Sequence, residues 1–239
     1  MPDIDLRLFK SKAALIEAAT DHLANILAEA LNGRGRASAM LSGGSSPKPI
    51  YEALAKMPLA WNGVGLSLVD ERWVPSGAAG SNADFIQDCF ADTPAQTAFF
   101  VPLYNGHATP EAGLDAAEQA LTLMAQPFDL CVLGMGMDGH TASWFPRSAG
   151  LDASLDPSST ATLAAIDATG CAVAGDHTDR ITLTFSAVSA SRNIILLLPS
   201  VEKLAVFKDA AKKDVRDAPV KALHALQNRL TVFALEGSQ

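Results

Sequence analysis

The pattern of apolar and polar positions changes period along the chain, and each period predicts one kind of element. Residues 11–31 carry apolar side chains at helical spacing, and Asn32-Gly33 predicts that this helix ends there. Short, mainly apolar runs at 37–41 and 193–198 predict buried strands, because a strand covered on both faces has no polar face to show. Strands and helices therefore alternate along the sequence.

The rest of the chain continues this alternation. Ser81 is of the residue type that caps a helix N-terminus, and the Ser-, Asp- and Pro-rich residues 147–160 predict a surface loop. The other expected elements, in chain order, are a helix from Pro47 to about Met57, a strand over 64–69, a helix after Ser81, a helix over 110–125, strands over 128–133 and 180–185, helical turns over 186–190, helices over 200–212 and 219–226, and a strand over 230–235.

Alternating strands and helices predict an α/β fold: a doubly wound, mostly parallel sheet with helices on both faces, a modified Rossmann-like arrangement. No internal repeat or low-complexity linker interrupts the pattern. We therefore expect a single domain over residues 1–239, a length that suits one large α/β domain.

Composition adds that the chain is acidic and rich in core-forming residues. Hydrophobic residues make up 49% and charged residues 18% of the chain, which predicts an ordered core. The formal net charge of −8 disfavours a nucleic-acid partner, which would need a basic face. A phosphorylated metabolite remains compatible with this charge, because a few placed cations can hold one phosphate.

The sequence does not predict a membrane or secreted protein. The longest strongly apolar run, 194–198, is far shorter than a membrane span, and the acidic N-terminal residues lack the apolar region of a signal peptide. The cysteines Cys89, Cys131 and Cys171 are widely spaced and form no Cys-x-x-Cys pair, which favours reduced core thiols. We expect a cytoplasmic protein.

Residues 128–146 form the most informative segment. An apolar run at 130–133 predicts a strand, and the three glycines within 134–139 predict a tight turn that delivers His140 at the strand's carboxyl end. Open α/β sheets bind ligands at that edge, and a neutral imidazole is a suitable general base near pH 7. Asp138 either orients His140 or builds the turn, and the hydroxyl-rich residues after His140 are expected to begin a helix.

The same glycines also match the dinucleotide-binding pattern Gly-x-Gly-x-x-Gly. That interpretation needs a helix, a second strand and an acidic residue about twenty positions further on. Here a polar loop follows residues 140–146. We therefore favour glycines that bring the backbone close to a substrate and position His140.

A second glycine-rich turn, 42–47, lies between an expected strand and an expected helix. Gly43 and Gly44 permit close backbone approach, and with Ser45 and Ser46 they lead into a helix start whose amide groups favour an anion. The turn is neither a P-loop nor a nucleophile elbow, because it lacks Gly-Lys-Ser/Thr and Gly-x-Ser-x-Gly. A tight turn without a ligand is the alternative.

Candidate cations follow or open other elements. Arg72 belongs to the segment Asp70-Glu71-Arg72, which comes directly after an expected strand. Arg180 opens another strand, and Lys203 lies early in an expected helix. Arginine can bind phosphate or carboxylate through two parallel hydrogen bonds, although surface ion pairs or solvated side chains are the alternative. The five histidines form no His-x-x-x-His pair or His/Cys cluster, so we expect no metal.

Taken together, these segments resemble the 6-phosphogluconolactonase family, which is related in fold to glucosamine-6-phosphate deaminase and ribose-5-phosphate isomerase. They occur in the family's order and span residues 41–203. The matching pieces are 41–48 with Tyr51, 70–75 with Ser81 and Asn82, 128–146, 180–185, and Glu202 with Lys203.

The resemblance implies hydrolysis of 6-phospho-D-glucono-1,5-lactone to 6-phospho-D-gluconate in the oxidative pentose phosphate pathway, without metal or redox cofactor. It implies that His140 draws a proton from the water that attacks the lactone carbonyl. Residues 43–46, Arg72, Arg180 and Lys203 correspond to positions expected to hold the phosphate or another polar end of the substrate. The implied partner is a small sugar-phosphate lactone, with no nucleic acid or membrane, and a monomer is the default.

Two alternatives share the expected fold. Deaminases resembling this chain would carry an aromatic residue in place of Arg72 and an Asn-Glu-Pro stretch after the Gly-His motif, whereas here the stretch is 142–146, Ala-Ser-Trp-Phe-Pro. A sugar-phosphate sensor of a transcriptional regulator would carry a helix-turn-helix before the domain. The first expected strand begins at residue 37 and the chain is acidic, so the sensor is disfavoured.

Overall fold

Seven parallel strands form the main sheet in a computed structural model that describes residues 4–237. Residues 1–3, part of the acidic N-terminal segment considered above, and residues 238–239 lie outside the described residues. The strands are, in spatial order, β1 (Asp5–Phe9), β10 (Leu230–Leu235), β9 (Asn193–Leu198), β6 (Leu130–Leu133), β2 (Ala37–Leu41), β3 (Val64–Leu68) and β5 (Phe99–Phe100). The expected α/β class with a mostly parallel sheet is confirmed.

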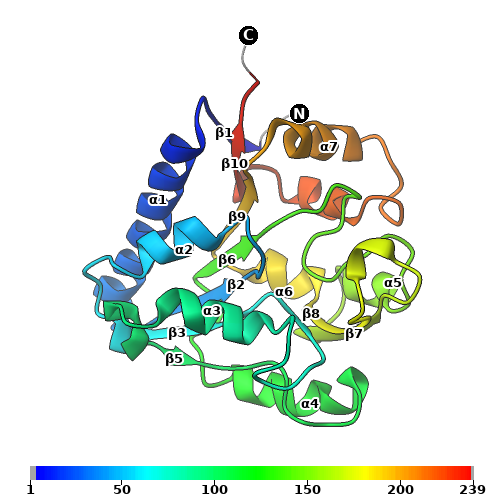
Figure 1. Cartoon of the computed structure of the whole chain (residues 1–239), viewed down its shortest axis with the longest axis horizontal. Helices are drawn as coiled ribbons and strands as arrows, with labels where there is room; N and C mark the ends of the chain where they lie inside the picture. The colour runs from blue at the N-terminus through cyan, green and yellow to red at the C-terminus, as the bar shows by residue number, and fades with distance from the viewer. Residues whose placement is uncertain (1–3, 238–239) are drawn as a thin grey trace.

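Helices connect these strands and pack on the sheet. They are α1 (Lys12–Arg34), α2 (Lys48–Leu54), α3 (Asn82–Phe90), α4 (Pro110–Leu121), α5 (Leu151–Leu155), α6 (Phe185–Ala190) and α7 (Val201–Ala210), together with the 3₁₀ segments η1 (Trp61–Gly63), η2 (Pro94–Thr97), η3 (Ala172–Ala174) and η4 (Pro219–Arg229). In Figure 1, α1 and α2 lie to one side of the strands and α7 lies to the other.

Hydroxyl caps define where several helices begin. Ser81, Thr184 and Ser200 each accept a hydrogen bond from the amide three residues further on, at the starts of α3, α6 and α7. Such a cap satisfies one of the amide groups that a helix leaves free at its first turn. The expected cap at Ser81 is therefore confirmed, and α3 and α7 begin beside strand ends where they can contribute side chains to a site.

A second, antiparallel sheet lies beside the main one and contains β4 (Asp70–Arg72), β8 (Asp179–Leu183) and β7 (Leu163–Asp167), in the order β4-β8-β7. In its register, Arg72 pairs with Arg180 and Asp70 with Thr182. β4 follows β3 after a single residue, so the chain passes from the parallel sheet into the antiparallel one at the carboxyl edge of β3. This crossing brings two arginines to that edge.

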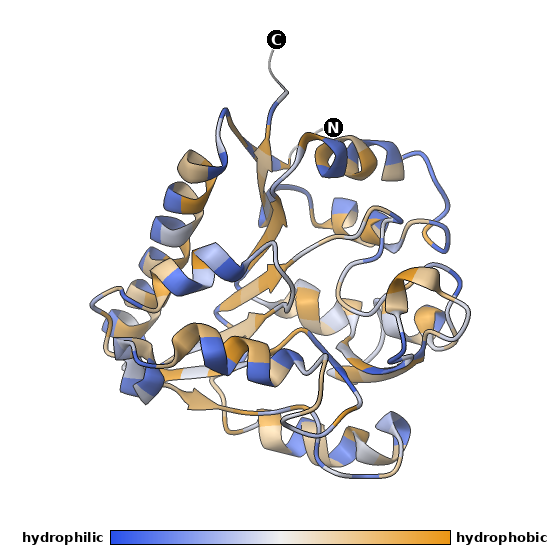
Figure 2. Cartoon of the chain, in the orientation of Figure 1, coloured by the Kyte–Doolittle hydropathy of each residue, from blue (hydrophilic) through white to orange (hydrophobic). Residues whose placement is uncertain are grey.

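The core follows the central strands. Every residue of β2, β3 and β6 is buried, as expected for strands covered on both faces. Figure 2 shows these strands mostly in the hydrophobic colour with some pale positions, while hydrophilic positions gather on the outer helices and loops. Across residues 4–237, no helix is both long and apolar enough to cross a membrane.

Several sequence-based boundaries need correction. Helix α1 continues through Gly33 and ends at Arg34, because Gly35, with φ of 69°, provides the left-handed cap expected at Gly33. Residue 37 does not begin the first strand, since β1 precedes it. β1 was missed because its residues are mostly half-buried and mix charged with apolar side chains, which weakens the strand pattern.

The region after His140 also differs from the prediction. Residues 141–150 form turns and isolated bridges instead of beginning a helix, and Ala142 has a positive φ of 48°. The expected loop 147–160 contains α5, and β7 follows it in the antiparallel sheet. The strand expected over 180–185 ends at Leu183 because Thr184 caps α6. Cys171 is half-buried rather than a core thiol.

Candidate active site

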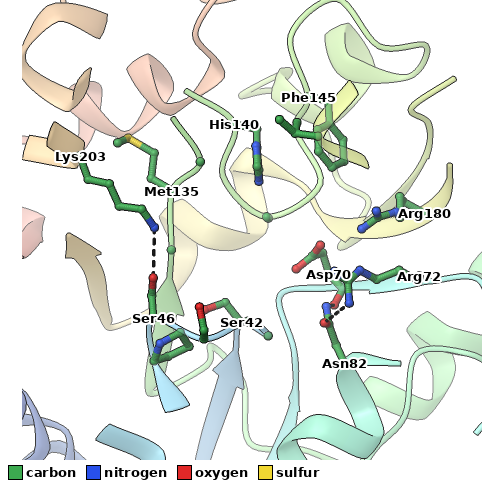
Figure 3. A pocket seen from close by; sticks show the side chains of 18 residues that line it. Ser42, Ser46, Asp70, Arg72, Asn82, Met135, His140, Phe145, Arg180 and Lys203 are labelled. Carbon is green, nitrogen blue, oxygen red and sulfur yellow. Dashed lines mark hydrogen bonds between the residues drawn. The ribbon is translucent and has the colours of Figure 1, made fainter. Parts of the chain in front are cut away.

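A cleft of about 280 Å³ lies at the carboxyl ends of β2, β3 and β6. Figure 3 shows Lys203 and Ser46 on one side, Arg72, Asp70, Asn82 and Arg180 on the other, and His140 with Phe145 between them. All the residues predicted for substrate binding line this cleft, and so does the predicted base: Gly43, Gly44, Ser45, Ser46, Arg72, His140, Arg180 and Lys203. Asp138 contacts His140 from the loop.

The imidazole of His140 is held through one nitrogen. Nδ1 lies 2.6 Å from Asp138 Oδ1, and the same oxygen accepts the backbone amide of His140 at 3.3 Å. Asp138 therefore both orients the ring and builds the turn, the two roles that the sequence left open. Burial raises the pKa of Asp138, but the hydrogen bonds and charge of His140 outweigh it and hold the pKa below its usual value. An ionised Asp138 keeps the proton on Nδ1 and leaves Nε2 as the basic nitrogen.

Contacts around the ring restrict its position. The Phe145 ring lies 4.7 Å from the imidazole, centroid to centroid. A Cβ atom at Gly136 would lie 2.2 Å from His140 Cε1 and 2.5 Å from Asp138 Oδ1, so only glycine fits there. The turn is closed by a hydrogen bond of 2.9 Å from the Gly136 amide to the His140 carbonyl oxygen. Gly136 therefore serves to position His140.

The turn after β2 presents backbone donors to the cleft. Within residues 4–237, the amides of 43–46 donate no hydrogen bond to a backbone oxygen. Gly44 has φ of 97°, and a Cβ atom at Gly43 would lie 2.0 Å from Asn82 Oδ1. Lys203 reaches the same turn, because its Nζ donates to Ser46 Oγ at 3.1 Å. Burial lowers the pKa of Lys203. Free amides beside an ammonium group suit a phosphate.

The two arginines lie on adjacent strands at the other side of the cleft. Arg72 Nη1 donates to Asn82 Oδ1 at 2.8 Å, and it also contacts the carbonyl oxygen of Gly80. Arg180 is buried, and its guanidinium lies 5.3 Å from the centre of the Phe145 ring. Burial lowers the pKa of Arg180, and the neighbouring Arg72 acts in the same direction. Two such cations attract an anion into the cleft.

Sequence reasoning missed three polar residues of this site. Asp70 is buried, lines the cleft and accepts a hydrogen bond of 2.6 Å from Ser143 Oγ. Glu71 is 1% exposed and accepts the amides of Asn82 and Ala83 at 2.7 and 2.8 Å. The sequence places all three in segments that carry the family resemblance but predicts no role for any of them in the site. For Asp70 and Glu71, the available signal was their place directly after the strand expected over 64–69.

The geometry offers no dinucleotide site at Gly134. No helix follows the glycines directly, and the next strand, β7, belongs to the antiparallel sheet. Across residues 4–237, no three His, Cys, Asp or Glu side chains gather in a group that could hold a metal ion. The arrangement can bind an anion and move a proton through the imidazole of His140.

The fold and the cleft define an α/β protein with a candidate ligand site at the carboxyl ends of its parallel strands. Comparison with known proteins agrees with this class. The model of the family described as glucosamine-6-phosphate isomerases/6-phosphogluconolactonase matches residues 10–232, and the chain belongs to this family. A 6-phosphogluconolactonase of Rhizobium meliloti is 36% identical over 220 residues, which cover 92% of this chain and 93% of that protein. One of Pseudomonas aeruginosa is also 36% identical, with 92% and 90% covered.

A solved structure is similar over nearly the whole length. The crystal structure of a 6-phosphogluconolactonase from Shewanella baltica superposes with a TM-score of 0.89 at 36% identity, and the match covers 98% of each chain. The similarity in fold therefore extends through both sheets.

Proposed function

We propose that this chain hydrolyses 6-phospho-D-glucono-1,5-lactone to 6-phospho-D-gluconate in the oxidative pentose phosphate pathway. The observation that carries the proposal is the His140–Asp138 pair, with Nδ1 engaged at 2.6 Å, in a cleft that also holds Lys203 and two arginines. The relatives named 6-phosphogluconolactonase support the choice of substrate. A base beside several cations suits attack on the carbonyl of an anionic lactone.

In the proposed mechanism, Nε2 of His140 accepts a proton from a water molecule as its oxygen adds to the lactone carbonyl carbon. Asp138 stabilises the imidazolium that forms, because its carboxylate accepts the Nδ1–H hydrogen bond. The tetrahedral oxyanion then re-forms a carbonyl as the bond to the ring oxygen breaks. The imidazolium returns its proton to that oxygen, which becomes a hydroxyl, and the product carboxylic acid ionises in water.

We propose that the phosphate lies against residues 43–46 and Lys203. The free amides of this turn and the ammonium group next to Ser46 supply hydrogen-bond donors and positive charge at one place. Arg72 and Arg180, on the opposite side, would hold another polar end of the substrate. They would also stabilise the negative charge that develops on the carbonyl oxygen. Binding energy from the phosphate would position the ring for attack.

The deaminase alternative is disfavoured by the residues in the cleft. Arg72 lines it where a deaminase would carry an aromatic side chain, and the relatives above are named lactonases. Nucleic acid and membrane are not proposed as partners, in keeping with the net charge of −8. A cytoplasmic monomer stays a prediction.

The test follows the loss of freshly generated 6-phosphogluconolactone in EDTA, corrected for spontaneous hydrolysis. We expect fast, metal-independent loss with the wild-type chain. His140→Ala should lose most of this activity, about a hundredfold or more as for other general bases, while its circular dichroism spectrum stays unchanged. Asp138→Asn should lower kcat with a smaller effect on KM, because it perturbs the base more than substrate binding.

Near-normal turnover by His140→Ala would contradict the assigned base. A folded wild-type chain that leaves the rate of lactone loss unchanged would overturn the proposed function. Binding of a panel of sugar phosphates would then be measured, because the cleft would still favour that class of ligand.

A further inference from the structure

The guanidinium of Arg72 is held by two neutral acceptors, a side-chain carboxamide and a backbone carbonyl. Nη1 donates to Asn82 Oδ1 at 2.8 Å and contacts the carbonyl oxygen of Gly80. Among the described residues, Nε of Arg72 is buried and has no hydrogen-bond partner. A buried charged donor without an acceptor costs stability, so this placement favours a ligand-binding role for Arg72 over a structural one.

Asn82 is itself fixed from several directions. Its Nδ2 donates to the carbonyl oxygen of Asp70 at 2.9 Å, and its backbone amide donates to Glu71 Oε1 at 2.7 Å. The same oxygen of Glu71 accepts the backbone amide of Arg72 at 2.8 Å. Asn82 Oδ1 also packs so closely against Gly43 that no Cβ atom fits there. The carboxamide therefore has one available orientation, with its oxygen toward Arg72 (Figure 3).

The neutrality of this acceptor matters for an anionic ligand. A carboxylate at position 82 has nearly the same shape and would still accept the hydrogen bond from Arg72, although it would lose the one from Nδ2 to the carbonyl oxygen of Asp70. It would also neutralise the guanidinium and repel a nearby anion. A carboxamide fixes the direction of the guanidinium and leaves its positive charge available.

We propose that Asn82 is a positioning residue for Arg72. It orients the guanidinium without neutralising it, so that Arg72 can bind an anionic oxygen of the substrate. This inference rests on the proposed function in one respect, namely that the ligand is an anionic sugar phosphate. It assigns to the first residue of α3 a role that is expressed only through Arg72.

A double-mutant cycle tests the positioning role with 6-phosphogluconate as the probe, measured by isothermal titration calorimetry. Asn82→Ala and Arg72→Ala should each weaken binding about tenfold, the usual loss for one charge-assisted contact. The double variant should bind no more weakly than Arg72→Ala alone, because Asn82 acts only through the guanidinium. Additive losses would overturn the proposal.

Asn82→Asp separates positioning from helix stability. The variant loses the hydrogen bond from Nδ2 to the carbonyl oxygen of Asp70, so a purely structural role predicts a lower Tm with unchanged binding. The positioning role predicts binding about tenfold weaker or more. Asn193→Asp is the matched control, because the Nδ2 of Asn193 also donates to a backbone carbonyl, that of Asp129 at 2.9 Å, at the start of β9 and away from the cleft. It should not change binding.

The two proposals fail in different ways. Tight 6-phosphogluconate binding without lactone hydrolysis would overturn the proposed function, and the double-mutant cycle would still test Asn82. Normal hydrolysis with unchanged binding by Asn82→Asp would overturn the positioning role and leave the hydrolase proposal in place.

Discussion

The imidazole of His140 lies close enough to the preceding turn that a single methyl group there would displace it. Gly136 faces the ring and Asp138, with no room for a Cβ atom, whereas at Gly134 the nearest atom to such a Cβ would be Ser42 Oγ at 3.9 Å. The two glycines occur in one short motif but meet different surroundings. Their sequence spacing alone does not distinguish them.

Gly136→Ala is therefore expected to reduce kcat for the lactone strongly, by about tenfold or more, because a misplaced base loses catalytic efficiency. The Tm should fall as well, since the ring or the turn must move. Gly134→Ala is the matched control, because its Cβ atom would make only an ordinary van der Waals contact. It should have a much smaller effect on kcat and on Tm. Equal losses in the two variants would contradict the role given to Gly136.

How far the sequence predicted the site differs from residue to residue. His140 was predictable because the glycine-rich turn after an apolar strand places one imidazole at a known edge. Asp138 was predictable as a neighbour but not as a partner with two roles. Asn82 was not predictable as a contact of Arg72, because the contact joins the start of α3 to β4 of the antiparallel sheet.

At the scale of elements, α1 shows how a helix end depends on backbone conformation. Gly33 is helical and exposed, with no atom within 4 Å of a built Cβ, whereas Gly35 has φ of 69° and caps the helix. Both glycines follow the apolar pattern closely, so the sequence allowed either as the end. Only the backbone dihedrals show which one is used.

Gly33→Ala should stabilise the protein by roughly 0.5–1 kcal/mol, because alanine loses less backbone entropy in a helix. Gly35→Ala should destabilise it by about 1 kcal/mol, because a Cβ atom disfavours the left-handed conformation. Urea unfolding of both variants measures the two effects against the wild type. Destabilisation by Gly33→Ala would show that the helix end is wrongly placed.

The antiparallel sheet is the element that most affects the site. The pairing of β4 with β8 brings Arg72 opposite Arg180, which lies more than a hundred positions later in the sequence. Strand patterns predict that a strand exists but not which strand it pairs with, and β4 is only three residues long. The placement of Arg72 beside Arg180 is therefore a consequence of strand pairing.

At the scale of the whole molecule, the two sheets share one hydrophobic core. Leu163 of β7 and Leu183 of β8 belong to the same buried cluster as Leu130 and Leu196 of the parallel sheet. We propose on this basis that residues 1–239 fold as a single domain. Urea unfolding followed by fluorescence and by circular dichroism should then give one coincident transition. Two separate transitions would contradict the single domain.

The stability of the molecule should depend on pH through Glu71. Burial raises its pKa to about 7 from the usual 4.5, although the amides of Asn82, Ala83 and Arg72 act in the opposite direction. The folded state therefore binds a proton more tightly than the unfolded state. This stabilisation is present in full below about pH 4.5 and is lost as the pH rises through 7.

Glu71→Gln should remove that dependence. Relative to this variant, the wild type should lose up to about 3 kcal/mol of unfolding free energy between pH 4.5 and pH 8, which corresponds to the difference between the two pKa values. Urea unfolding of both proteins across this range measures the difference. An equal pH dependence in the two proteins would contradict the raised pKa of Glu71.

The sequence by itself determined the α/β class, the main buried strands and helices, and the segments that reach the cleft. These follow from local periodicity, capping residues and glycine placement, which act over a few neighbouring positions. Only the tertiary structure decided that Asp70 and Glu71 are buried, that Asn82 holds Arg72, and that Arg72 and Arg180 lie on paired strands. The Arg72–Arg180 pairing joins residues far apart in the chain, and the contact of Asn82 with Arg72 joins a helix start to a strand across a turn. Both depend on strand pairing and packing that no local pattern encodes.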